Sequence, residues 1–368
     1  MKLNKLLLQN FRNYLNLVLV PHPNLNIIYG RNAQGKSNLL ESIYYLSFVN
    51  SYRTKNDKQI INWDKNFFRL EGDLERDGQN YYIEISCSEK NKRLKVNRVE
   101  LDRSKYFGTM RTVLFTPDDI FVIKGGPNFR RKYLDRQIFQ IYSRYYNIYS
   151  DFKKVLYQRN TLLKQIAKGY MGKGQLEIWD PQYATLCSEI LKRRISFLKK
   201  LRLLTAKYHQ KLTDNKEEIE LQYKMECFTL NENKLPSPEE ILKHLNILRK
   251  SEIEKGISLL GPHRDEIIIN IDGYVLRDFG SQGQQRTAIL SLKMAELELI
   301  KNETGEFPVL LLDDVMSELD LFRQHFLAES ITANIQTFIT TTDKNIGEKL
   351  GKDYLGVEVT KGNVYLGG

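Results

Sequence analysis

Eight residues near the start of the chain have the types and the spacing that hold a polyphosphate. They are Gly30, Arg31, Asn32, Ala33, Gln34, Gly35, Lys36 and Ser37, and they match the pattern G-x-x-x-x-G-K-[ST] at every fixed position. Glycines allow backbone N–H groups to wrap an anion that a Cβ would obstruct. We therefore expect Lys36 to reach the β- and γ-phosphates of a nucleotide and the Ser37 hydroxyl to bind Mg²⁺, with Asn38 beside them.

A second set of residues supplies the acids that such a loop requires. The apolar run from Val309 to Leu312 ends in Asp313 and Asp314. We expect Asp313 to bind Mg²⁺, directly or through water, and Asp314 to orient or deprotonate the attacking water. A strand that ends in two acids is common in proteins without this chemistry. In combination with the phosphate loop, however, it predicts a site for ATP hydrolysis.

Specific secondary structure must position both sets. Apolar residues from Ile27 to Tyr29 predict a buried strand that enters the loop. The apolar positions after Ser37 fall near helical spacing, and a helix there would direct its partial positive N-terminus at the phosphates. The run before Asp313 predicts a strand buried on both faces, whose acids emerge at the carboxyl edge of the sheet.

The N-terminal third adds strands around this centre. Residues 1–50 read as strand, turn, strand, strand, loop and helix, with Phe11 to Tyr14 between the first two strands. Arg12 in that segment is either a solvated charge or a nucleotide contact. Residues 67–101 predict an antiparallel meander with a hairpin turn at Asp77-Gly78, and Val113 to Phe115 predicts another short strand.

The middle of the chain is helical, aromatic and basic, from about residue 130 to 255. Between Asp151 and Lys211 there are 14 Lys and Arg against 4 Asp and Glu. An apolar stripe from Leu186 to Tyr208 predicts one long helix, and Pro236 to Glu240 predicts the start of another. We expect this arm to contact nucleic-acid phosphates without reading bases. We advance the candidate contacts only as a group, because each one alone fits a solvated surface charge better than a contact; they are Arg130, Arg131, Lys192, Arg193, Arg194, Lys199 and Lys200.

The last third returns to strands and then to a helix. Glu266 to Ile271 predicts a strand, Asp272-Gly273 a hairpin turn, and Gly280 to Arg286 the opening of a helix over 288–300. Gly261 to Asp265 has two readings: a turn before the strand without a function, or a segment beside the ATP site.

Composition sets the class. The chain has 368 residues, 27% charged and 41% hydrophobic, with a formal charge of +11. Three scattered cysteines predict neither a zinc site nor disulfides, and no run is apolar enough to cross a membrane, so we expect a cytoplasmic protein.

The two halves of the ATP site lie 277 residues apart (313 − 36). We therefore expect an α/β nucleotide-binding fold split by an inserted helical arm, with boundaries at 1–128, 129–255 and 256–368.

Several motifs carry a resemblance to a known family. Ser281 to Gln285 resembles the signature loop of ABC-type ATPases, and Ser317 to Asp320 resembles their D-loop; with Phe11 to Tyr14 they are similar to the SMC-like branch. Other segments resemble the RecF family of bacterial recombination mediators. They are residues 30–37, 116–119, 125–127 with Arg130 and Arg131, 261–265, 281–287 and 312–314.

The resemblance implies an SMC-type ATPase head with a phosphate-loop sheet and an antiparallel β subdomain. It implies that Asn32 lies near the γ-phosphate and Arg12 on the nucleotide side, and that Ser281 and Gly283 contact the γ-phosphate bound to a second subunit. Two nucleotides would then be enclosed in an ATP-dependent homodimer. It further implies double-stranded DNA near single-strand gaps as ligand, RecO and RecR as partners, help in loading a recombinase, and a weak DNA-stimulated ATPase activity.

Three positions depart from the wider ABC pattern. Gln282 replaces a glycine, Asp314 replaces a glutamate, and threonines 340–342 stand where a switch histidine is usual. A shorter acid at Asp314 predicts slow hydrolysis that acts as a release switch. Two alternative functions are a transporter motor subunit, which leaves the basic arm without a role, and a small-molecule kinase, which leaves Ser281 to Gln285 unexplained.

Overall fold

A computed structural model describes residues 1–89, 91–229, 231, 234–331 and 334–367. The chain divides into two compact units. The first contains residues 1–119 and 293–368, and the second contains residues 120–292. The division falls within one helix, α9 (Gln282–Thr304).

The first unit contains an antiparallel sheet with the strand order β2-β1-β4-β5-β6-β7. Its strands are β1 (Lys2–Phe11), β2 (Tyr14–Leu19), β4 (Phe67–Arg76), β5 (Gln79–Ser88), β6 (Lys92–Val96) and β7 (Val99–Glu100). Two-residue turns join β1 to β2, β4 to β5 and β6 to β7, and Asp77 with Gly78 takes positive φ values in the turn between β4 and β5. The predicted meander and its hairpin turn are confirmed.

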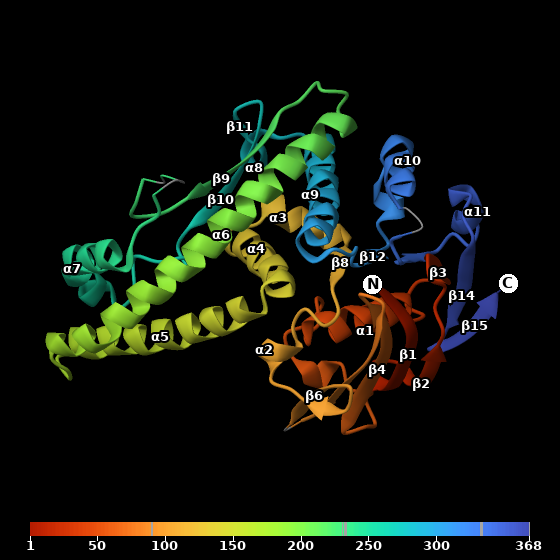
Figure 1. The fold of residues 1–368 in the computed structure, drawn as a ribbon, viewed down its shortest axis with the longest axis horizontal. Helices are drawn as coiled ribbons and strands as arrows, with labels where there is room; N and C mark the ends of the chain where they lie inside the picture. Colours follow the sequence, from red (N-terminus) through yellow and green to blue (C-terminus); the bar gives the residue numbers. More distant parts are fainter. Residues whose placement is uncertain (90, 230, 232–233, 332–333, 368) are drawn as a thin grey trace. The chain divides into compact units, whose positions relative to one another are not determined.

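The second sheet of this unit has the order β15-β14-β3-β13-β12-β8. Its strands are β3 (Leu25–Tyr29), β8 (Thr112–Phe115), β12 (Val309–Asp313), β13 (Thr337–Thr341), β14 (Tyr354–Thr360) and β15 (Asn363–Gly367). All neighbours pair in parallel except β14 and β15. Segments from both ends of the sequence, red and blue in Figure 1, therefore share one sheet. Every residue of β12 and β13 is buried, as expected for central parallel strands.

Helix α1 (Lys36–Phe48) packs against strands of both sheets. It is buried on nearly all sides, including its polar residues Glu41, Ser42 and Ser47. The remaining helical segments of the first unit are α2 (Arg103–Tyr106), α10 (Leu321–Ser330) and α11 (Ile346–Leu350), with short 3₁₀ turns at Asp57–Gln59, Pro117–Asp119 and Met316–Glu318. The predicted strand, loop and helix start around the phosphate loop are confirmed.

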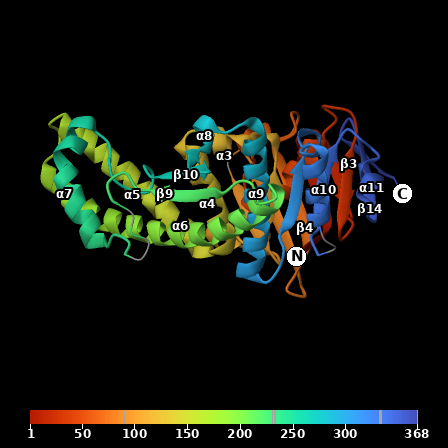
Figure 2. The same ribbon diagram turned by 90° about the horizontal axis from the view of Figure 1, so that it is seen from above.

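The second unit is mostly helical. Its helices are α3 (Ile120–Lys124), α4 (Pro127–Ile141), α5 (Ser143–Ala167), α6 (Leu176–Leu212), α7 (Pro238–Lys255) and α8 (Leu276–Phe279), with a 3₁₀ turn at Lys173–Gln175. Helices α5 and α6 pack against each other, and α7 packs against both near one end (Figures 1 and 2). An apolar cluster holds that end together. It contains Leu162, Leu163, Ile166 and Leu176, with Trp179 and Ile253 against them.

A three-stranded antiparallel sheet, in the order β11-β10-β9, completes this unit. Its strands are β9 (Ile219–Lys224), β10 (Glu266–Ile271) and β11 (Tyr274–Val275), and β9 packs along α6. The expectation of helix throughout 130–255 is wrong at β9. The alternating burial of Ile219, Leu221 and Tyr223 is a strand pattern, and it becomes decisive only when β10 pairs with it residue by residue.

The predicted long helix and the helix after Pro236 are both confirmed. Helix α6 spans the predicted stripe, and α7 begins with Ser237 as N-cap. The Ser237 hydroxyl accepts from the Glu240 backbone N–H, while the Glu240 carboxylate accepts from the Ser237 N–H. Among the described residues, no helix is both long enough and apolar enough for a membrane crossing.

Candidate nucleotide-binding site

The phosphate loop leaves β3 and enters α1 through a backbone that only glycine tolerates at two points. Gly30 has φ 150° and Gly35 has φ 120°. A Cβ on Gly30 would collide with the Val359 carbonyl oxygen, and one on Gly35 would lie 2.5 Å from Asn13 Nδ2. Both glycines of the pattern are thus required by their neighbours as well as by the anion they would surround.

Two hairpins hold the loop from outside. From the β1–β2 turn, Asn13 Nδ2 donates to the Gln34 carbonyl at 2.9 Å, and the Tyr14 hydroxyl donates to the Gly35 carbonyl at 3.0 Å. From the β14–β15 turn, the Lys361 N–H donates to Gln34 Oε1 at 2.8 Å. Gln34 is therefore a structural anchor of the loop, whereas Arg31, Asn32 and Ala33 are exposed on it.

Lys36 is buried and lies across the loop. Its Nζ donates to the carbonyls of Gly30 and Arg31 at 3.0 and 3.1 Å. Asn38 is held by Asn13, whose Oδ1 accepts from Asn38 Nδ2 at 2.8 Å, and by Arg53, which donates to Asn38 Oδ1 at 2.6 Å. The curled backbone, the inward ammonium and the hydroxyl of Ser37 at the helix start form a donor set that fits a nucleotide polyphosphate with its Mg²⁺.

The two acids lie at the same sheet edge as the loop. In the sheet, β13 separates β3 from β12, and Thr340 of β13 pairs with Asp313. Asp313 is buried, and its oxygens accept from two hydroxyls, Thr340 Oγ1 at 2.8 Å and Tyr52 at 2.7 Å. The adjoining carboxyl edges of parallel strands therefore bring the predicted loop and the predicted acids together.

Asp314 has a left-handed backbone conformation and a raised pKa. It has φ 52°, and its N–H donates to Thr340 Oγ1 at 2.9 Å. Burial, and then the negative charge of Asp313, raises the pKa of the Asp314 carboxyl, while Lys36 opposes the shift. A carboxyl with a raised pKa beside a lysine of the phosphate loop suits the predicted role in orienting or deprotonating water.

Arg12 is engaged inside the first unit. Its Nη2 and Nε donate to the two carboxylate oxygens of Glu41 at 2.8 and 3.0 Å, and its Nη1 donates to the Gln59 carbonyl at 2.8 Å. Glu41 is completely buried in α1 and also accepts from Ser51. The reading of Arg12 as a freely solvated charge is therefore wrong, because a bidentate ion pair fixes it one helical turn beyond the phosphate loop.

Ser281 and Gly283 belong to the second unit. Ser281 is exposed and precedes α9, where its Oγ accepts from the Gln284 N–H at 3.2 Å and its N–H donates to Gln284 Oε1 at 2.9 Å. This reciprocal pair is a capping box, which the spacing S-x-x-Q would have predicted. The predicted signature loop thus forms the N-terminus of a long helix.

The predicted DNA contacts separate into two groups. Arg130 and Arg194 are buried: Arg130 pairs with Glu266 at 2.9 Å, and Arg194 pairs with Asp135 at 2.8 Å. Arg131 donates to the Asp265 carbonyl at 2.7 Å. Arg130 and Arg194 are therefore corrected to structural residues, because a buried, paired guanidinium cannot meet a phosphate. Lys192, Arg193 and Lys200 are exposed on α6, and Lys199 is half-buried.

The segment from Gly261 to Asp265 is part of the core of the second unit. The Pro262 carbonyl accepts from Arg194 at 2.6 Å, and Asp265 Oδ2 accepts from the Tyr223 hydroxyl at 2.8 Å. Burial lowers the pKa of His263 to about 4 and raises the pKa of Asp265 to about 6. The structural reading of this segment is supported, because the Pro262 carbonyl bonds to α6 and the Asp265 side chain bonds to β9.

Two residues of the site, Tyr52 and Glu41, escaped sequence reasoning, and the sequence marks Thr340 only as one of three threonines where a switch histidine is usual. Tyr52 lies 261 positions from its partner Asp313. No local pattern marks a tyrosine in a loop as a carboxylate partner. The contact of Thr340 with Asp313 depends on the parallel pairing of β13 with β12, which places both residues at the same sheet edge.

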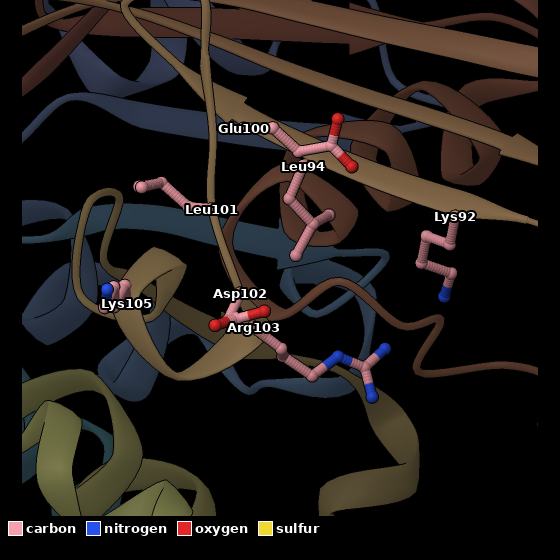
Figure 3. A pocket seen from close by; sticks show the side chains of 7 residues that line it. All are labelled: Lys92, Leu94, Glu100, Leu101, Asp102, Arg103 and Lys105. Atoms are coloured by element: carbon pink, nitrogen blue, oxygen red, sulfur yellow. The ribbon is translucent and has the colours of Figure 1, made fainter.

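A further hollow of about 490 Å³ lies elsewhere in the first unit (Figure 3). Its seven lining residues come from β6, β7, α2 and the link between β7 and α2: Lys92, Leu94, Glu100, Leu101, Asp102, Arg103 and Lys105. Lys92 and Arg103 both donate to the Val49 carbonyl, at 3.1 and 2.8 Å. None of the residues that line this hollow belongs to the phosphate loop. Its cations Lys92 and Arg103 already bond to the carbonyl of Val49, the C-cap residue of α1.

The chain matches a known family over nearly all its length. The family described as the RecF/RecN/SMC N terminal domain matches residues 2–365. The DNA replication and repair protein RecF of Listeria monocytogenes serotype 4b is 40% identical over 371 residues, which cover 99% of each chain. The protein of the same description from Staphylococcus aureus strain bovine RF122 is 41% identical over 345 residues, 93% of each chain.

A solved structure agrees with these relatives. It is described as the recombination mediator protein RecF with ATP in the RecFOR pathway, and it superposes with a TM-score of 0.91 at 36% identity. The superposition covers 100% of this chain and 98% of that one. Similarity over the full length, including the helical arm, sets aside the transporter motor and the small-molecule kinase as alternatives.

Proposed function

This chain belongs to the RecF family of the SMC-type ATPases, whose RecF members are DNA replication and repair proteins. On that premise we propose that it is an ATP-gated clamp for duplex DNA. Two copies would close on DNA beside a single-strand gap when ATP binds, and slow hydrolysis would release them. The main observation in support is that Lys36, Asp313 and Asp314 meet at one sheet edge. There the positive charge of Lys36 opposes the rise in the pKa of Asp314.

Each residue of the loop has a role in this proposal. Backbone N–H groups from Gly30 to Ser37 and the ammonium of Lys36 would hold the phosphates, with Asn32 near the γ-phosphate and Asn38 supporting the loop. Ser37 and Asp313 would hold Mg²⁺, which neutralises phosphate charge when bound. Tyr52 and Thr340 orient Asp313 by donating to its two oxygens.

Hydrolysis would depend on Asp314. Its carboxylate would orient or deprotonate the water, and its raised pKa makes it a better proton acceptor than an ordinary aspartate. Because an aspartate is one methylene shorter than the glutamate usual in ABC-type ATPases, it reaches less far, and we propose a slow, DNA-stimulated ATPase activity.

The homodimer follows from the signature loop. Ser281 and Gly283 would contact the γ-phosphate held by the second copy, so that each nucleotide is gripped by two chains. The ATP-bound relative supports nucleotide binding by this fold. Arg12, fixed by Glu41 beyond the phosphate loop, would lie on the nucleotide side of the site.

The proposed DNA surface is the exposed face of α6. Arg193, Lys200 and Lys207 follow one another at intervals of seven residues, and Lys192 and Lys199 repeat that interval beside them. Residues seven apart share a helix face and lie about 10 Å apart along the axis. Such a row suits contact with successive phosphates, which gives affinity that falls with salt and does not depend on sequence.

Partners follow the pathway named for the ATP-bound relative, RecFOR. We propose that this chain acts with RecO and RecR and promotes loading of a recombinase at gaps, within the cytoplasm.

Sedimentation velocity tests the clamp. The wild-type chain and Lys36→Met are compared without nucleotide, with ATP and Mg²⁺, and with duplex DNA added. We expect a wild-type dimer only with ATP, and a Lys36→Met monomer throughout, because the substitution removes the ammonium from the loop. A wild-type chain that stays monomeric with ATP and binds duplex equally well would overturn the proposal.

Charge reversal tests the DNA surface. The triple variant Lys192→Glu, Arg193→Glu and Lys200→Glu should bind duplex DNA more weakly, and each lost phosphate contact should reduce the salt slope by about 0.9. The matched control reverses three exposed lysines of the first unit, Lys55, Lys65 and Lys105, and should leave the slope unchanged. Equal slopes for both triple variants would remove α6 as the DNA surface.

A further inference from the structure

The turn after α6 contains an acid that touches the signature loop. Glu217 lies between the end of α6 and the start of β9, and its Oε1 accepts from Gln284 Nε2 at 3.1 Å. Gln284 is the N3 residue of the capping box described above, in which it pairs with Ser281. The carboxylate of Glu217, 67 positions away in sequence, therefore fixes the Gln284 side chain, which in turn accepts from the Ser281 N–H.

The contact decides which way the Gln284 amide faces. A side-chain amide has one oxygen and one NH₂ group, and only the NH₂ can donate to a carboxylate. With Nε2 toward Glu217, Oε1 is directed at the Ser281 N–H, as the 2.9 Å distance shows. The Gln284 N–H meanwhile donates to Ser281 Oγ, which uses a lone pair of that oxygen and leaves the hydroxyl hydrogen to donate elsewhere.

Glu217 is in turn contacted by a buried histidine of α6. His209, completely buried near the end of α6, has its Nε2 3.3 Å from Glu217 Oε2. The approach lacks the geometry of a hydrogen bond. His209 Nδ1 lies 3.3 Å from Ser291 Oγ on α9. Burial lowers the pKa of His209, while Glu217 and then Asp272 of the β10–β11 turn oppose that shift.

We propose that Glu217 is a positioning residue for Ser281: by fixing the Gln284 amide it presents the Ser281 hydroxyl hydrogen to the γ-phosphate held by a second copy of this chain. The inference rests on the proposed dimer, and it assigns a role to a residue outside every motif of the site. Without the carboxylate, Gln284 is free to rotate away, and the first turn of α9 loses its cap.

The experiment compares three variants of the full chain. Glu217→Ala removes the acceptor. Glu217→Gln keeps an oxygen that can accept from Gln284 Nε2 but carries no charge. Glu218→Ala is the matched control, since Glu218 is the adjacent acid and bonds Asp272 through its own backbone. Its N–H donates to Asp272 Oδ1 at 2.8 Å, and its carbonyl accepts from the Asp272 N–H at 2.9 Å.

The first measurement is ATP-dependent dimerisation by sedimentation, together with ATP affinity at a protein concentration where the chain is monomeric. Glu217→Ala should require about tenfold more protein to dimerise, as loss of a charge-assisted hydrogen bond implies. Glu217→Gln should recover most of that loss, Glu218→Ala should match wild type, and the ATP affinity of the monomer should be the same in all. Equal dimerisation of Glu217→Ala and wild type, or an equal loss in Glu218→Ala, would overturn the inference.

The second measurement separates this inference from the proposed function. Amide exchange of the Gln284 N–H, followed without nucleotide, reports the capping box alone. It should be about tenfold faster in Glu217→Ala than in wild type or Glu218→Ala. If wild type fails to dimerise with ATP but Glu217→Ala shows this faster exchange, the clamp is wrong and the positioning role stands. Equal exchange rates in all three chains would exclude the positioning role.

Discussion

Two groups of buried carboxylates, Asp313 in the first unit and Asp180 with Glu252 in the second, have different partners. In the first unit, Asp313 accepts from the hydroxyls of Tyr52 and Thr340, and no cation pairs with it in the described part of the chain. In the second unit, Arg159 donates at once to Asp180 and Glu252, at 2.8 and 2.6 Å, and all three side chains are almost fully buried.

The difference shows which buried acids remain available to bind a cation. A hydroxyl orients a carboxylate without cancelling its charge, so Asp313 retains an unneutralised charge that suits a bound cation. A guanidinium cancels the charge and fixes the geometry, so the acids around Arg159 hold α5, α6 and α7 together. Asp313, with neutral donors, thus belongs to the candidate site, whereas Asp180 and Glu252, with a shared guanidinium donor, belong to the scaffold of the second unit.

Breaking a scaffold pair should give the largest effect. Arg159→Met leaves Glu252 buried without its cation, and the free energy of unfolding of the full chain should fall by about 3–5 kcal/mol. Urea unfolding followed by circular dichroism measures it. Lys154→Met, which removes an exposed ion pair with Asp151 on the same helix, should change it by less than about 1 kcal/mol. Similar values for the two variants would show that burial does not distinguish these pairs.

Asp265 sharpens the comparison, because it is a buried acid of the second unit that accepts from a hydroxyl, that of Tyr223. Its pKa is raised from 3.8 to about 6, so its stabilising contribution is full below pH about 4 and is lost as pH rises to 6. His263 acts oppositely: its pKa is lowered from 6.5 to about 4, so its contribution is full above pH about 6.5 and is lost as pH falls to 4. In wild type, the contributions of Asp265 and His263 to the pH dependence of stability therefore have opposite signs.

Asp265→Asn should therefore expose the slope of His263. The free energy of unfolding of this variant should rise between pH 4 and 6.5 and exceed that of wild type at pH 7 by up to about 3 kcal/mol. Denaturant titrations at a series of pH values measure both. His263→Gln should show the reverse trend, with stability falling from pH 4 to 6. A variant Asp265→Asn that follows the wild-type curve would mean that Asp265 titrates normally.

The smallest expected effect comes from the donor at the site. Tyr52→Phe removes the phenol that donates to Asp313 Oδ2 and keeps the ring that packs on Tyr44. The Mg²⁺ concentration for half-maximal nucleotide binding should rise about tenfold. Tyr81→Phe, which removes a hydroxyl bonded to Gln79 far from the phosphate loop in sequence, should leave the Mg²⁺ dependence unchanged. An unaltered dependence in Tyr52→Phe would show that Thr340 alone orients the acid.

The parts of the site predicted correctly depend on neighbours in sequence. The φ of Gly30 and Gly35, the helix start at Lys36 and the strand before Asp313 follow from local geometry and from uninterrupted apolar runs. The failures involve distant partners. Strand β9 required β10 to pair with it, and Arg194 required Asp135 on another helix to become a buried ion pair.

The sequence by itself therefore determined the phosphate loop, the acidic strand end and the capped start of the signature helix, because each is specified by residues within about one turn or one strand. Only the tertiary structure decided which charges are exposed and which side chains meet. Lys192 and Arg194 are two residues apart on α6, yet one is exposed and the other is buried. Two residues rotate a helix by about 200°, and only the packing of the neighbouring helices and strands decides which face is covered.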